Sequence, residues 1–261
     1  MSRLLRALLI LVAAGQLVMA AAFFFRWPLV INNWPLDGTT PLTFILFAAF
    51  FAAAAASTLW PILSGNPGAL AGVGLDYMVI LGPMAVYTLW LGARGEGGFL
   101  IFGVICAAGS FFGLWLFLQT RRLPLDTSIP MPAPVKISFA VFVAALVYTS
   151  IRLFLQMPTI PWQVTPELSV IIGCLFLGAA TYFVYGLLRP SWANAAGQLA
   201  GFLAYDLVLI IPIIRLWTTV APEFRGRLLV YTIVVVYSGL LAFFYLFINK
   251  ETRIINAAST D

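Results

Sequence analysis

The stretch ELSVIIGCLFLGAATYFVYGLL at residues 167–188 decides the fold class of this chain. After Glu167 it contains 21 residues without a charged side chain. A helix rises about 1.5 Å per residue, so this stretch is long enough to cross a bilayer core of about 30 Å. Its apolar residues do not alternate with polar ones, which predicts a membrane-spanning helix rather than a barrel strand.

The rest of the chain has the same character. Its 261 residues are 62% hydrophobic and 9% charged, whereas a soluble domain carries about 25% charged residues. In water too much apolar surface would stay exposed, and a bilayer removes that cost. We therefore predict an all-α fold, a polytopic transmembrane helical bundle of about eight spans whose partner is the lipid bilayer. The expected spans are residues 4–25, 42–63, 67–91, 99–119, 135–155, 167–188, 192–217 and 228–248.

The second half of the chain repeats features of the first at an offset of about 125–130 residues. The longest polar interval, residues 121–134, holds four prolines and predicts a cytoplasmic linker between repeats at 1–120 and 135–250, with a tail at 251–261. Four spans in each half would make the repeats parallel, related by an axis along the membrane normal. The matching features are Phe24…Pro28 with Phe154…Pro158, Trp34 with Trp162, Thr40-Pro41 with Thr165-Pro166, Ala71-Gly72 with Ala200-Gly201, and Gly98 and Ser110 with Gly226 and Ser238.

The first span resembles a cleavable signal peptide, because Arg3 and Arg6 precede a short apolar run that ends in Met-Ala-Ala-Ala at 19–22. A retained span is the alternative that we favour, since it has a counterpart in the second half. With the N-terminus inside, eight basic residues lie on the inner side and six on the outer side. For a multi-pass protein of the cell membrane, this bias predicts that both termini are cytoplasmic. The basic residues are scattered, which favours basic loops over nucleic-acid binding.

Two aspartates fall well inside expected spans, and each adjoins a tyrosine: Asp76-Tyr77 and Tyr205-Asp206. A carboxylate at the bilayer centre costs at least about 2.5–3.5 kcal/mol on insertion scales. One interpretation is a shared polar site at the repeat interface, which binds a substrate or couples its movement to protonation. The alternative is that each acid is bonded to a polar group of a neighbouring helix. Because adjacent helical residues point about 100° apart, the two acids need not be equivalent.

Four further residues complete the candidate set. Gln16 and Gln198 lie inside spans and could join the polar site or bond to its acids. Pro83 and Pro212 each follow an acid by six or seven residues and are expected to kink their helices. Such kinks free carbonyl groups that could line a cavity, although more often they only shape packing.

Small residues predict where helices approach closely. Gly109 and Gly113 form a GxxxG motif on the fourth expected span. The motif supports helix packing and makes this face a candidate for a homo-oligomer or for a partner in a membrane complex.

The sequence NWPL at residues 33–36, followed by TPLT at 40–43 and a helix rich in small residues, resembles a pattern of uncharacterised bacterial multi-pass membrane proteins. The resemblance covers residues 31–60. It implies a bacterial inner-membrane protein and carries no assigned activity.

Residue types exclude several kinds of chemistry. The chain has no histidine, and its two cysteines, Cys106 and Cys174, lie apart within expected spans. We therefore expect no metal site, no cofactor and no catalytic residue of a known motif.

Three functions remain open. A non-catalytic membrane scaffold or accessory subunit is our first expectation, because few polar residues lie within the spans. A transporter of a small solute or lipophile, with a polar site at Asp76 and Asp206, is the alternative. A membrane-embedded lipid-modifying enzyme is the second alternative, weakened by the missing histidine.

Overall fold

The computed structural model describes residues 1–36 and 38–253. In this part of the chain eight helices are long and apolar enough to cross a membrane, as predicted. Most of the predicted tail at 251–261 lies outside the described residues. The long helices are α1 (Arg3–Phe24), α3 (Pro41–Leu63), α4 (Leu70–Ala93), α5 (Gly97–Thr120), α6 (Ala133–Phe154), α7 (Pro166–Leu188), α8 (Trp192–Leu216) and α9 (Arg225–Phe243). The short elements are α2 (Pro28–Ile31), 3-10 turns at Pro67–Ala69 and Pro222–Phe224, and a π-helix at Phe244–Ile248.

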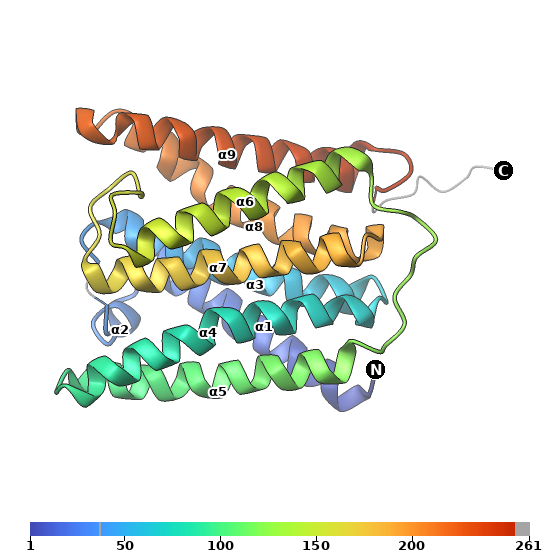
Figure 1. Ribbon diagram of the computed structural model, residues 1–261, viewed down its shortest axis with the longest axis horizontal. Coiled ribbons are helices and arrows are strands. Elements are labelled where there is room, and N and C mark those ends of the chain that lie inside the picture. Colours follow the sequence, from blue (N-terminus) through green and yellow to red (C-terminus); the bar gives the residue numbers. More distant parts are fainter. Residues whose placement is uncertain (37, 254–261) are drawn as a thin grey trace.

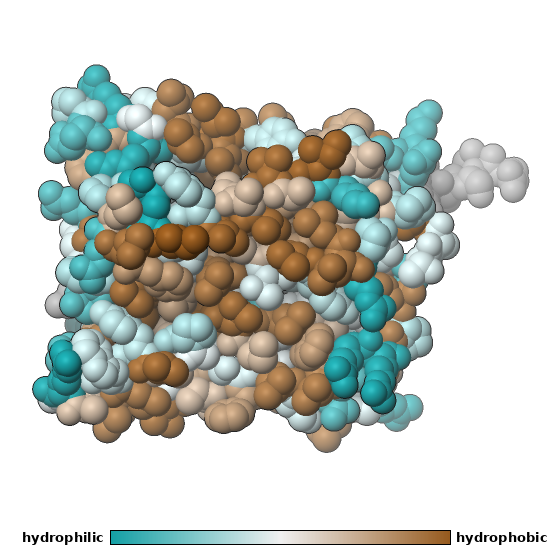
Figure 2. Space-filling view, viewed as in Figure 1, coloured by the Kyte–Doolittle hydropathy of each residue, from teal (hydrophilic) through white to brown (hydrophobic). Residues whose placement is uncertain are grey.

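The surface confirms a multi-pass membrane protein. Hydrophobic side chains cover the middle of the molecule, and hydrophilic ones gather at its two ends (Figure 2). Phe111 and Val230 are 72% and 63% exposed, although both are large and apolar. Large contiguous apolar surfaces of this kind are rare on soluble monomers, so the covering solvent here is lipid.

The eight long helices form two layers of four (Figure 1). One layer has the order α1, α3, α8, α9, and the other has the order α5, α4, α7, α6. Each layer takes two helices from each half of the chain. The helix contacts of the two halves match. In the first half α1 packs on α3 and α4 packs on α5, and in the second half α6 packs on α7 and α8 packs on α9. Two four-helix repeats would give such matching contacts. The repeat itself stays a prediction.

Glycines bring helices close together within a layer. A Cβ atom added to Gly113 of α5 would lie 2.7 Å from the backbone oxygen of Gly74 in α4. A Cβ atom on Gly109 would lie 2.5 Å from the Leu81 side chain, also in α4. The GxxxG face is therefore covered by α4 within the same chain, and it is not the free partner surface that we predicted. An oligomer that forms through another surface stays a prediction.

Aromatic rings hold the two layers apart. Phe50 of α3 meets Phe176 of α7 with ring centroids 5.6 Å apart, and Phe142 of α6 meets Phe202 of α8 at 4.9 Å. These rings are too large to allow the close backbone approach that glycines permit within a layer. The layers therefore contact each other mainly through side chains.

The bundle has two distinct ends. The terminal end, at the right in Figure 1, carries the N-terminus, the described residues after the π-helix at Phe244–Ile248, the 121–132 connection and the turns at 64–69 and 189–191. The opposite end carries the connections at 25–36 with 38–40, 94–96, 155–165 and 217–224. An even number of spans places both ends of the described chain on one side.

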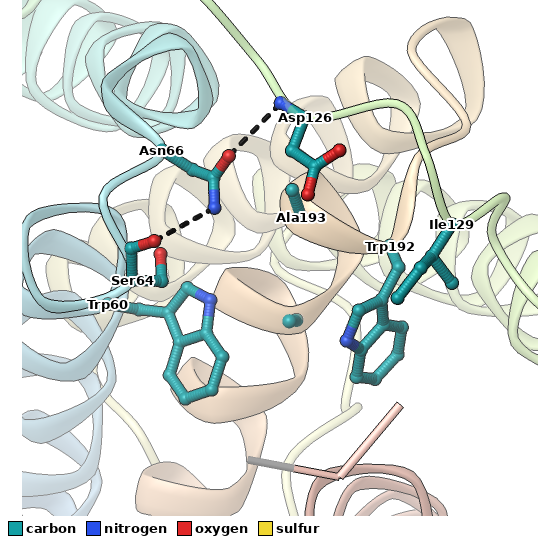
Figure 3. Close-up of a pocket in the computed structure, with 8 residues that line it drawn as sticks. Trp60, Ser64, Asn66, Asp126, Ile129, Trp192 and Ala193 are labelled. Carbon is teal, nitrogen blue, oxygen red and sulfur yellow. Dashed lines mark hydrogen bonds between the residues drawn. The ribbon is translucent and has the colours of Figure 1, made fainter. Parts of the chain in front are cut away.

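The predicted linker is ordered at the terminal end. The N–H of Asp126 donates to Asn66 Oδ1 at 3.0 Å (Figure 3). The N–H of Trp192 donates to Ile129 O at 2.9 Å. The N–H of Ser128 donates to Asp126 Oδ1, which lowers the pKa of that carboxyl group. The linker thus ties the α3–α4 turn to the α7–α8 turn, and a pocket of about 90 Å³ lies between them.

The glycine contacts give a stability prediction. Gly113→Ala should lower the free energy of unfolding by about 1–3 kcal/mol, because the added methyl group overlaps the α4 backbone. Gly15→Ala in α1 is the matched control, since a Cβ atom there meets nothing within 4 Å. Denaturant unfolding in a mild detergent measures both, and equal stabilities of the two variants would contradict this packing.

Candidate functional site

A cavity of about 930 Å³ lies between the two layers, and every long helix contributes to its lining. Its walls are mainly apolar and rich in phenylalanine. All six polar residues of the predicted site line it, namely Gln16, Asp76, Tyr77, Gln198, Tyr205 and Asp206. Pro83 and Pro212 lie inside α4 and α8 but are not among the lining residues.

The cavity opens toward the opposite end of the bundle. There it is bordered by residues 158–160 of the α6–α7 connection and by Gly226 at the start of α9. It also reaches the edges of the layers, because Ile105 of α5 and Tyr148 of α6 line it while being 61% exposed each. A molecule could therefore enter from the bilayer as well as from the end of the bundle.

Three hydrogen bonds join the layers at the part of the cavity that is nearer the terminal end. Tyr77 of α4 accepts a hydrogen bond from Gln16 Nε2 of α1 at 2.7 Å, and its hydroxyl lies 2.6 Å from Thr58 Oγ1 of α3. Gln198 Nε2 of α8 donates to the backbone oxygen of Tyr182 in α7. Each of these bonds crosses from one layer to the other and helps to close this end. At the opposite end, Thr39 Oγ1 before α3 donates to Gln163 O, and Arg227 of α9 donates to Ile160 O, so the layers are also joined there.

Asp76 is buried without a partner for one of its oxygens. Its side chain is 9% exposed, and Oδ1 has no hydrogen-bond partner among the described residues. A Cβ atom on Gly178 of α7 would lie 2.9 Å from this oxygen, so the glycine leaves the space that the carboxyl group occupies. An unbonded carboxyl oxygen in a membrane interior is costly. Asp76 therefore has the free bonding capacity that a substrate or a proton could use.

Asp206 has a different environment. Its Oδ2 accepts a hydrogen bond from Ser238 Oγ of α9 at 2.8 Å, while Oδ1 has no partner among the described residues. The neighbouring Tyr205 bonds to the hydroxyl group of Tyr231, also in α9. Asp76 thus packs against α7 and Asp206 against α9, so the two acids are not equivalent although both line one cavity. The opposite order of Asp and Tyr in the two pairs predicts such a difference, because adjacent helical residues point about 100° apart.

Several lining residues or bonding partners were not among the predicted site residues. Ser238 had a sequence signal as the repeat counterpart of Ser110, but nothing in the sequence joined it to Asp206. Thr58, Tyr182 and Tyr231 had no signal, because isolated hydroxyl groups are common in membrane helices. Arg152 and Arg227 also line the cavity. From the sequence, both arginines were counted on the outer side, and Arg152 was placed at the end of a span.

Comparisons with known proteins do not assign a family. No protein-family model matches the chain, no curated protein matches it, and no solved structure matches its fold. The bacterial resemblance of residues 31–60 therefore stays a prediction, and the argument for function depends on the cavity.

The cavity predicts a difference between two neighbouring alanines in α7. Ala179 lines the cavity, whereas Ala180 is 1% exposed and packs within the protein. In a background with both native cysteines changed to alanine, we expect Ala179→Cys to react with N-ethylmaleimide at least about tenfold faster than Ala180→Cys, because thiol reactivity requires access. Mass spectrometry of the protein in lipid nanodiscs measures both rates. Equal rates would mean that no open cavity lies between the layers.

Proposed function

We propose that this protein carries an amphipathic lipophile across the membrane and binds it in the cavity between the two layers. The observation that supports this proposal best is one cavity of about 930 Å³ that reaches both buried aspartates. Binding sites for small molecules have volumes of about 300–1,000 Å³ and are mostly apolar with a few placed polar groups. The phenylalanine-rich walls, interrupted by Asp76 and Asp206, fit that description.

The cavity favours a carrier over the scaffold that the sequence suggested first. A scaffold would gain from a tightly packed bundle with a free small-residue face. Protein interiors normally pack without large voids, because each void loses dispersion contacts. Here the layers are separated by a large cavity, and the small face at Gly109 and Gly113 is already covered. The scaffold role is thus the second candidate.

The arrangement of contacts supports alternating access. Helices pack closely within a layer, whereas side-chain contacts join the layers. The cavity reaches the opposite end, where the hydrogen bonds across the layers involve the connections, through Thr39 with Gln163 O and Arg227 with Ile160 O. Nearer the terminal end, the helices themselves are joined across the layers by hydrogen bonds of Tyr77 and Gln198. Rocking one layer against the other would break these bonds and expose the cavity at the terminal end. In the predicted orientation, the end that is open here faces away from the cytoplasm.

A cavity-filling variant tests the carrier. Ala179→Trp should lower the rate at which a fluorescent phospholipid crosses between leaflets of proteoliposomes by at least about tenfold, because the indole fills the binding volume. Ala108→Trp is the matched control, since Ala108 is exposed on α5 and does not line the cavity. Wild-type protein that does not accelerate crossing above empty vesicles would contradict the proposal. Chemical change of the lipid during the assay would instead identify the enzyme alternative.

The two acids should differ in transport. Asparagine keeps the size of aspartate but cannot exchange a proton. Asp76→Asn should remove the response of transport to a pH gradient, because the unbonded carboxyl of Asp76 is the one available to substrate or proton. Asp206→Asn should have the smaller effect, since Ser238 already occupies one of its oxygens. Equal responses to the gradient in wild type and both variants would exclude proton coupling.

A further inference from the structure

Two arginines lie together where the cavity reaches the opposite end. Arg152 is in the last turn of α6 and Arg227 is in the first turn of α9, and both line the cavity. Arg152 donates from Nη2 to Pro158 O at 3.1 Å and from Nε to Thr159 Oγ1 at 3.3 Å. Arg227 donates from Nη1 to Ile160 O at 3.1 Å. Three consecutive residues of one connection therefore hold both guanidinium groups at the same mouth.

The positive charges of these arginines are not paired with a carboxylate of the described residues. Arg152 also donates to the hydroxyl group of Tyr148, and Arg227 also donates to the backbone oxygen of Glu223. All acceptors are thus neutral oxygens. A guanidinium has five N–H donors, so three bonds leave two free on Arg152 and two bonds leave three free on Arg227. Both groups keep charge and donors for a ligand.

Aromatic rings and backbone oxygens fix the arginines in place. The guanidinium carbon of Arg152 lies 5.6 Å from the centroid of the Tyr148 ring, and that of Arg227 lies 4.5 Å from the centroid of Phe224. Cation–π contacts of this kind orient a guanidinium without neutralising it. Little side-chain entropy is then lost when a ligand binds.

We propose that Arg152 and Arg227 bind the phosphate head group of an anionic membrane lipid whose chains lie in the cavity. The site lies at the end of the spans, where lipid head groups are found. Arginine forks match phosphate oxygens with paired hydrogen bonds. Below the arginines the cavity continues past Tyr148 and Val230, which are 61% and 63% exposed at the edge formed by α6 and α9. A lipid could therefore enter sideways with its head group at the arginines.

This inference deepens the proposed function, on which it rests, by naming the class of lipophile. It also adds a role for the outermost part of the cavity, which lies apart from Asp76. Binding preference and transport are separate measurements. A preference for anionic lipid without transport would contradict the carrier alone, and transport without the preference would contradict only the head-group assignment.

The test is native mass spectrometry of the full chain released from nanodiscs with equimolar phosphatidylglycerol and phosphatidylcholine of identical chains. Wild-type protein should retain phosphatidylglycerol over phosphatidylcholine by at least about fivefold, because both lipids carry a phosphate but only phosphatidylglycerol has a net negative charge to balance the two arginines. The double variant Arg152→Gln/Arg227→Gln should retain both lipids equally. The matched control Arg94→Gln/Arg225→Gln removes the same charge at the same end, from residues that do not line the cavity, and should keep the preference.

Three results would overturn the proposal: no preference in wild type, an unchanged preference in Arg152→Gln/Arg227→Gln, or an equal loss in the control. Displacement of the lipid by inorganic phosphate would also overturn it, because the site would then be one for a soluble anion. If the double variant does not fold, the single variants Arg152→Gln and Arg227→Gln provide the test of lipid preference. Each should lower the preference by at least about twofold, since each keeps one of two charge-assisted contacts.

Discussion

This structure depends on how closely its helices can approach one another. Glycines allow close packing within each layer, and aromatic rings prevent it between the layers. Gly74 and Gly113 let α4 and α5 approach until their backbones touch, and Gly201 of α8 faces the α3 backbone at Ala53. Between the layers, the rings of Phe50 and Phe176 meet and keep the backbones of α3 and α7 farther apart. In lipid no hydrophobic force drives helices together, so the size of the facing side chains decides how closely helices approach. The cavity follows from that contrast.

The two-layer arrangement places the polar groups at different depths along the cavity. Near the terminal end, Tyr77 and Gln198 take part in hydrogen bonds that join the layers. Asp76 lies beside Tyr77, and Asp206 lies nearer the middle of its helix; both interrupt apolar walls. At the opposite end Arg152 and Arg227 border the mouth. An amphipathic ligand needs this sequence of environments, with charge at the bilayer surface, an apolar volume below it, and a few polar groups along the path.

The sequence predicts the spans well because hydropathy is a local property. All eight expected spans are helices, with ends shifted by a few residues at most positions. The buried acids could also be found, because a charge within a span is conspicuous. The choice of partners could not be predicted: Gly109 and Gly113 suggested an external face and instead pack against α4. Ser238 bonds to Asp206 across 32 residues, and only the meeting of α8 with α9 places them together.

An electron cryomicroscopy map of the full chain in nanodiscs made from native membrane lipids tests the central claim most directly. We expect the two four-helix layers to stand apart, with elongated non-protein density between them that begins beside Arg152 and Arg227. Layers in direct contact, with side chains filling the space beside Asp76 and no such density, would contradict this account.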